Sequence, residues 1–289
     1  MLILVTLLGF YIGAIFGNIY FNLKENLIKT IEKEEDKKTK KKNKKTKNTK
    51  KGILYNIPIF SYIFAYNKEE KKLVKPKLYS EIITGIIFAL LLIIDQKNGV
   101  NEVLLISFPL MFGFIYLLGE IEREKHIIEP NVITFGVMVA AIEISLKFVI
   151  NFSGSIYTKA NIIAAGFYMG IVLLMFVIQM ATASKDPESK YLLDIVMILF
   201  ILTIFFGSIF MLKSIVCIII YILLGHFLGV FSNKEYKENI LVKKENGKVK
   251  TRKESAFVKE GVYIPYAEII GYVTIVYLLV ELTLPQIMR

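Results

Sequence analysis

The chain alternates between long runs of apolar residues and short segments rich in charge. Crossing about 30 Å of hydrocarbon takes roughly 20 helical residues, somewhat fewer where a helix is packed inside protein. A helix also satisfies its own backbone hydrogen bonds, which lipid cannot do. We therefore predict an all-α fold, a polytopic membrane helical bundle of about eight transmembrane helices. The expected spans are residues 2–20, 79–95, 103–119, 132–151, 161–181, 191–212, 214–231 and 264–283.

The sixth and seventh runs are separated only by Lys213. They are either two full spans in a tight hairpin or one long segment with a re-entrant part. Their combined length favours two spans.

The distribution of lysine and arginine predicts the orientation, because short cytoplasmic connections retain positive charge. If Met1 starts outside, the inner segments hold 31 of the 36 lysines and arginines. We therefore expect a multi-pass protein of a cytoplasmic (inner or plasma) membrane, with both termini on the non-cytoplasmic side. The first run lacks the basic residues that precede a cleaved signal sequence, so it is predicted to be a span. The inner segments are 21–78, 120–131, 182–190 and 232–263.

Composition narrows the class of protein further. A hydrophobic content of 55% with a mean hydropathy of +0.55 is too apolar for a water-facing surface. The net charge of +11 does not indicate nucleic acid, because the lysines stand in a few blocks between apolar runs. Cys217 is the only cysteine, which excludes disulfides within the chain and zinc sites of the CxxC type.

Two local features have simple physical interpretations. Residues 32–51 are low in complexity and too charged to bury apolar area, so we expect a disordered tether that is attracted to anionic headgroups of the bilayer. Gly9, Gly13 and Gly17 recur every four residues, which lets the first helix approach a neighbour closely. This stripe predicts packing and not a site.

Two acidic clusters fall on the predicted cytoplasmic face. They are Gly119-Glu-Ile-Glu-Arg-Glu-Lys-His126, after the third run, and Ser184-Lys-Asp-Pro-Glu-Ser-Lys190, before the sixth. Two carboxylates a few ångströms apart cannot both ionise cheaply, so such a pair can share a proton and activate water. Spacing alone does not favour this chemistry over ordinary solvated loop charges.

Four segments carry a resemblance to the type IV prepilin peptidases. Asn56-Ile-Pro-Ile-Phe-Ser-Tyr-Ile-Phe64 and Ser80-Glu-Ile-Ile-Thr-Gly85 resemble that family's "NIP" and "VELLTG" signatures. His126-Ile-Ile-Glu-Pro-Asn-Val-Ile-Thr134 is similar to its "IIPN-x-LT" region, and Ile264-Pro-Tyr266 with Gly271 to its "IPFGPFLALG". The resemblance covers nearly the whole chain.

The resemblance implies a membrane aspartic endopeptidase that removes basic leader peptides from type IV pilin-like precursors at the cytoplasmic membrane face. Residues 1–85 would form an N-terminal region with a span and a basic loop, and residues 86–289 the peptidase-like transmembrane core. Where N-methylation is retained, S-adenosylmethionine would be the methyl donor. No zinc is expected, because residues 66–72 stand where many members carry cysteine pairs.

The resemblance implies that Glu122 and Glu188 stand at the positions of the family's two catalytic aspartates. Asp186, Glu120 and Glu124 are alternates, depending on where gaps are placed. The family's GxGD motif is absent from the chain. A catalytically inactive relative, acting as a binding or assembly component of a pilus or type II secretion system, is therefore the alternative function.

Overall fold

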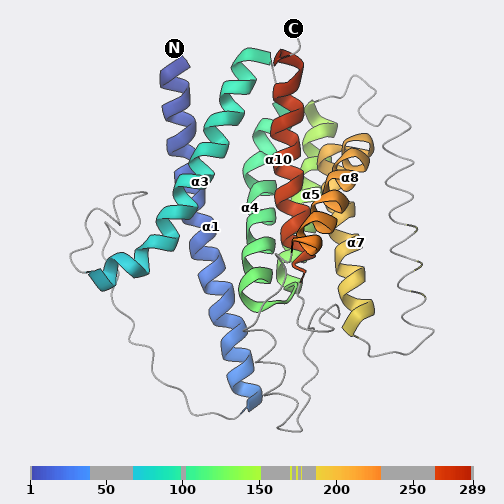
Figure 1. The fold of residues 1–289 in the computed structure, drawn as a ribbon. Helices are drawn as coiled ribbons and strands as arrows, with labels where there is room; N and C mark the ends of the chain where they lie inside the picture. The colour runs from blue at the N-terminus through green and yellow to red at the C-terminus, as the bar shows by residue number, and fades with distance from the viewer. Residues whose placement is uncertain are drawn as a thin grey trace. The chain divides into compact units, whose positions relative to one another are not determined.

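The computed structural model describes residues 2–39, 68–98, 102–150, 170, 174, 177, 187–228 and 264–287. Within these ranges the fold is all-helical, without strands, as predicted. The helices are α1 (Leu2–Thr39), α3 (Lys68–Asn98), α4 (Glu102–Lys125), α5 (Pro130–Ile150), α7 (Pro187–Phe206), α8 (Ser208–Phe227) and α10 (Tyr266–Ile287) (Figure 1).

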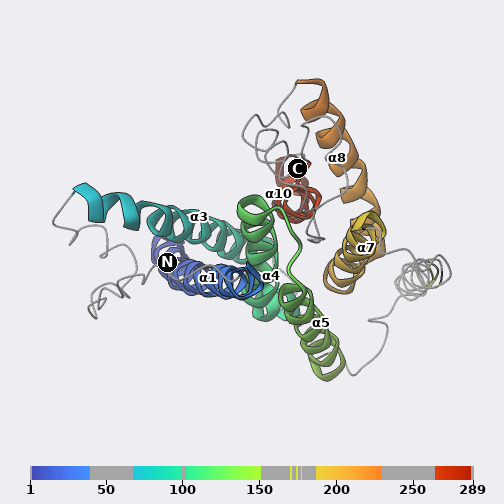
Figure 2. The same ribbon diagram turned by 90° about the horizontal axis from the view of Figure 1, so that it is seen from below.

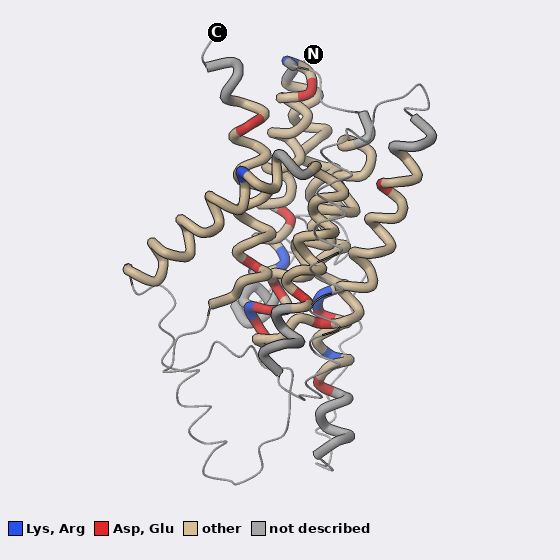
Figure 3. Tube along the Cα trace, turned by 90° about the vertical axis from the view of Figure 1, so that its right-hand side faces the viewer, with Lys and Arg blue, Asp and Glu red and all other residues tan. Residues whose placement is uncertain are grey.

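The apolar runs account for these helices. In the described part of the chain, five helices are long and apolar enough to cross a membrane, and two further apolar helices are shorter. Figure 3 shows long uncharged stretches between the charged residues of the helices. Seven of the eight predicted spans coincide with a helix. The remaining predicted span, residues 161–181, lies outside the described residues except for the helical residues Gly170, Leu174 and Val177. The eight-span topology therefore stays a prediction. The five candidate spans are Ile3–Glu32, Lys75–Lys97, Leu104–Lys125, Phe210–Phe227 and Tyr266–Thr283, and the shorter helices are Pro130–Leu146 and Leu193–Phe206.

The chain divides into two compact units, residues 1–101 with 281–289 and residues 102–280. In the first, α1 and α3 lie side by side and antiparallel (Figure 1). The glycine stripe of α1 makes this possible: a Cβ on Gly13 would lie 2.6 Å from the Thr84 carbonyl oxygen, and one on Gly17 would lie 2.7 Å from that of Ser80. The Ser80 hydroxyl donates a hydrogen bond to the Gly17 carbonyl at 3.0 Å. The prediction of close packing by this stripe is confirmed.

Helix α1 is much longer than the predicted span. It continues to Thr39, so residues 32–39 are helical, although the sequence led us to expect disorder from residue 32 onward. Glutamate and lysine favour helices, and this part mixes both charge signs at spacings such as Glu34 and Lys38, which support a helix. Residues 40–51 lie outside the described residues.

In the described part of the second unit, five helices contact one another in a closed order. Helix α4 packs on α5, α5 on α7, and α7 on α8. Helix α8 meets α10 through the buried hydroxyls of Ser214 and Thr274, 3.2 Å apart, and through the rings of Phe210 and Tyr277. Helix α10 returns to α4 near Gly271, where a Cβ would lie 2.6 Å from the Ile115 side chain. The chain thus brings its last described helix against its central apolar helix.

A glycine separates α7 from α8. Gly207 has φ 82° and ψ 162°, a conformation that is essentially restricted to glycine. Its N–H bonds the Thr203 carbonyl and its carbonyl accepts from Met211, so it ends one helix and starts the next. The predicted break at Lys213 is therefore wrong, because Lys213 lies within α8. Figure 2 shows α8 running at a steep angle to α7 rather than beside it.

The glycine stripe yields a stability prediction. Gly13→Ala places a methyl group against α3 backbone, and such overpacking costs about 1–3 kcal/mol. We expect a lower thermal unfolding midpoint in detergent, measured by circular dichroism. Gly170→Ala is the matched control, because nothing lies within 4 Å of its added Cβ. Equal effects of the two substitutions would contradict the packing role.

The conformation of Gly207 yields a second prediction. Gly207→Ala forces an L-residue into this region at a cost of about 1–3 kcal/mol. Hydrogen exchange should accelerate at the amides of Gly207 and Met211, which bond across the junction. Unchanged exchange there, with Gly170→Ala measured alongside, would show that the junction tolerates a side chain.

Candidate functional site

The end of α4 is held by a tight connection to α5. His126 follows the helix with φ 57°, and its N–H donates to the Glu122 carbonyl at 2.7 Å. The Glu129 carbonyl then accepts the N–H of Val132 at 2.9 Å, and Pro130 begins α5 at the position where a missing N–H costs least. Ile128 and Val132 are buried on this connection. The last turns of α4, which carry the first acidic cluster, therefore end at a defined place.

Glu122 is fully buried and bonded to the start of another helix. Its carboxyl oxygen Oε2 accepts the backbone N–H of Glu268 at 2.7 Å, in the first turn of α10. The first N–H groups of a helix have no partner within the helix, and an acidic side chain there also complements the helix dipole. Glu122 thus caps α10 and is covered from water.

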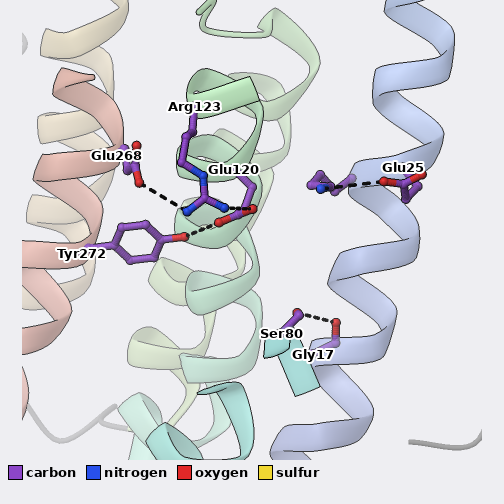
Figure 4. Close-up of polar contacts among 8 residues, drawn as sticks. Gly17, Glu25, Ser80, Glu120, Arg123, Glu268 and Tyr272 are labelled. Atoms are coloured by element: carbon purple, nitrogen blue, oxygen red, sulfur yellow. Dashed lines mark hydrogen bonds and ion pairs between the residues drawn. The ribbon is translucent and has the colours of Figure 1, made fainter. Parts of the chain in front are cut away.

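Glu120 lies in a different environment, together with residues of α10. Its carboxylate accepts from the Arg123 guanidinium at 2.5 Å and from the Tyr272 hydroxyl at 3.3 Å. The other guanidinium nitrogen lies 3.8 Å from the Glu268 carboxylate. Figure 4 shows Glu120 and Arg123 on α4 facing Glu268 and Tyr272 on α10. We call these four residues the carboxylate cluster.

Two glycines let the helices approach at this cluster. A Cβ on Gly119 of α4 would lie 3.1 Å from the Tyr272 ring of α10. One turn earlier on α4, Ile115 packs against Gly271 of α10. Small residues at such contacts allow close backbone approach in membrane helices. The tyrosine therefore reaches Glu120 because its neighbour on α4 has no side chain.

Charge is unbalanced in the cluster. Two carboxylates face one guanidinium, and the buried carboxyl group of Glu122 lies on the same helix turns of α4. The side chains of Glu120 and Glu268 are 13% and 17% exposed, while that of Arg123 is 59% exposed. The arrangement can bind a cationic group, and its carboxylates can accept a proton from water if the guanidinium moves away. In the part of the chain that the structure describes, no three His, Cys, Asp or Glu side chains form a metal-binding group.

The structure describes three of the sequence-derived site residues in full, Glu120, Glu122 and Glu124. Glu122 and Glu120 lie on the same turns of α4 with different partners, and Glu124 is exposed. Glu188 lies in the first turn of α7, but its side chain and the whole of Asp186 lie outside the described residues. That Glu122 and Glu188 form a pair stays a prediction.

Sequence reasoning did not single out Glu268 or Tyr272 as site residues. An acidic residue in the first turn of an apolar helix was the available signal. It also missed the buried ion pair of Lys77 and Glu81, 3.8 Å apart, within the "VELLTG"-like segment and the turn before it. Here the signal was opposite charge at i,i+4 spacing in an apolar helix.

Comparison of the chain with protein families, with curated proteins and with solved structures finds no match.

The cap made by Glu122 can be tested directly. Glu122→Ala leaves the partly buried Glu268 N–H without its acceptor, which costs about 1–3 kcal/mol. Glu122→Gln keeps an acceptor oxygen and should lose less. We expect a lower unfolding midpoint and faster exchange at the start of α10 for the alanine variant. Glu124→Ala, at an exposed position of the same helix, is the control and should change neither quantity.

Proposed function

We propose that this protein is a prepilin-peptidase-like membrane endopeptidase, which removes basic leaders from type IV pilin-like precursors. One observation carries the proposal: the acidic turns that lead into one family-like segment contact another family-like segment in the fold. The Glu122 side chain, beside the segment 126–134, bonds Glu268 of the segment 264–271, although the two residues are 146 apart. The acidic turns just before segment 126–134 contribute Glu120 to the carboxylate cluster, and segment 264–271 contributes Glu268.

In this proposal Glu120 replaces Glu122 at the first catalytic position. Glu122 is fully buried and occupied as a helix cap, so substrate and water do not reach it. Glu120 and Glu268 are both partly exposed and both contact Arg123. Without the guanidinium, two carboxylates so placed favour a shared proton.

The chemistry would be peptide hydrolysis. One carboxylate accepts a proton from water as the oxygen attacks the scissile carbonyl, and its protonated partner donates to the leaving amine. Water adds across the C–N bond, and the enzyme ends with the same number of protons. The roles of Glu120 and Glu268 are interchangeable in this scheme, and Glu188 remains a further candidate for the second position.

The remaining expectations belong to the same proposal. The site lies at the cytoplasmic face of a cytoplasmic membrane, where the positive-inside distribution puts residues 120–131. The Lys-rich tract attracts anionic headgroups, and methylation of the new N-terminus, where present, uses S-adenosylmethionine.

A specific observation favours a second function, a non-catalytic component that binds such precursors during pilus or secretion-system assembly. Glu122 is occupied by the α10 backbone, and Glu120 and Glu268 are both paired with Arg123. Carboxylates held in this way can bind a basic leader without activating water.

Cleavage of a prepilin-type precursor from the protein's own genome, followed in membranes, separates these functions. We expect leader removal by the wild-type chain and a loss of at least about 100-fold in Glu120→Gln and Glu268→Gln, because general acid–base catalysis is worth about 10² to 10⁴ in rate. Glu124→Gln is the matched control and should retain activity. Glu122→Gln and Glu188→Gln, measured in the same series, test the original pair.

Two outcomes would redirect the assignment. Activity lost only in Glu122→Gln and Glu188→Gln would restore the pair that the sequence suggested. Precursor binding without cleavage by the wild-type chain would favour the non-catalytic component.

A further inference from the structure

The cation that pairs with the two carboxylates of the cluster comes from the chain itself. Arg123 stands three residues after Glu120 on α4 and reaches across to Glu268 on α10. Its guanidinium therefore joins the two carboxylates that the proposed function requires (Figure 4).

Exposure distinguishes Arg123 from the groups that it contacts. Its side chain is 59% exposed, whereas those of Glu120 and Glu268 are mostly covered. A ligand that approaches the two carboxylates from solvent meets the guanidinium first. Tyr272 contacts Glu120 from α10, so it holds this carboxylate in place if the guanidinium leaves.

We propose that Arg123 occupies the position that a lysine or arginine side chain of the leader takes when it binds, and that leader binding exchanges one cation for the other. This inference rests on the proposed function, because it concerns how that site selects its substrate. Arg123 is then a specificity-determining residue: neutral and acidic segments do not replace it.

Two features make the exchange physically reasonable. The contact of Arg123 with Glu268 is long, 3.8 Å, and the guanidinium side is mostly exposed to solvent, which weakens this ion pair. Leaving two neighbouring carboxylates without a cation is energetically unfavourable. Replacement of the arginine by another positive group therefore costs less than its simple departure. A leader with several basic residues supplies further charge close to the site once the first has bound.

The opposing interpretation is that Arg123 is a structural clamp between α4 and α10. The two interpretations predict effects of opposite sign on cation binding. Removing a competing cation tightens the binding of a basic peptide, whereas removing a clamp loosens the site and weakens it.

The test measures binding of a fluorescent hexalysine peptide to the full chain in phosphatidylcholine nanodiscs, by anisotropy at low salt. Arg123→Gln should bind the peptide about fivefold more tightly, which corresponds to release of one partly exposed ion pair. Lys125→Gln is the matched control, because it removes the same charge from the same helix turn, and should change affinity less than about twofold. Adding Glu268→Gln to Arg123→Gln should abolish the gain.

Arg123→Lys keeps the charge but loses the planar fork that contacts two carboxylates at once, so it should tighten binding by a smaller factor. It decides the question if Arg123→Gln fails to fold. Unchanged or weaker binding by the arginine variants, an equal gain in Lys125→Gln, or no binding by any variant would overturn the inference. The probe has no leader cleavage site, so this result is independent of whether the precursor is cleaved.

Discussion

The hydrogen bond from the Glu268 N–H to the buried carboxyl group of Glu122 is the constraint on which the rest of the site depends. The start of a helix leaves N–H groups without internal partners, and in an apolar environment water does not supply them. The side chain of Glu122 therefore specifies where α10 begins relative to the end of α4. The contacts of Arg123 with Glu268 and of Tyr272 with Glu120 join these same two helix ends.

Close packing of helix backbones holds neighbouring helices together within each unit. Lipid is as apolar as the helix surfaces, so association of membrane helices depends on tight fit and on interhelical hydrogen bonds. Gly119 and Gly271 bring α10 against α4, and the Ser214 and Thr274 hydroxyls join α8 to α10. In the first unit, Gly13 and Gly17 with the Ser80 hydrogen bond perform the same task for α1 and α3.

Three glutamates of one short acidic segment have three different environments. Glu122 is buried as a cap, Glu120 is paired at the partly exposed cluster, and Glu124 is exposed. Successive residues of a helix point in different directions, so positions two apart do not share a partner. This is why the choice between Glu120 and Glu122 required the fold.

The sequence by itself determined the helices and the glycine-mediated contact, because apolar run length and small-residue spacing are local properties of the chain. Its errors were also local: helix α1 continues through residues 32–39 because mixed charges favour a helix, and the break in the sixth run lies at Gly207 instead of Lys213. Only the tertiary structure decided that Glu122 is a cap, that Glu268 and Tyr272 join Glu120, and that Arg123 lies between the two carboxylates. These contacts join residues about 150 positions apart, and no local pattern specifies which helix ends will meet.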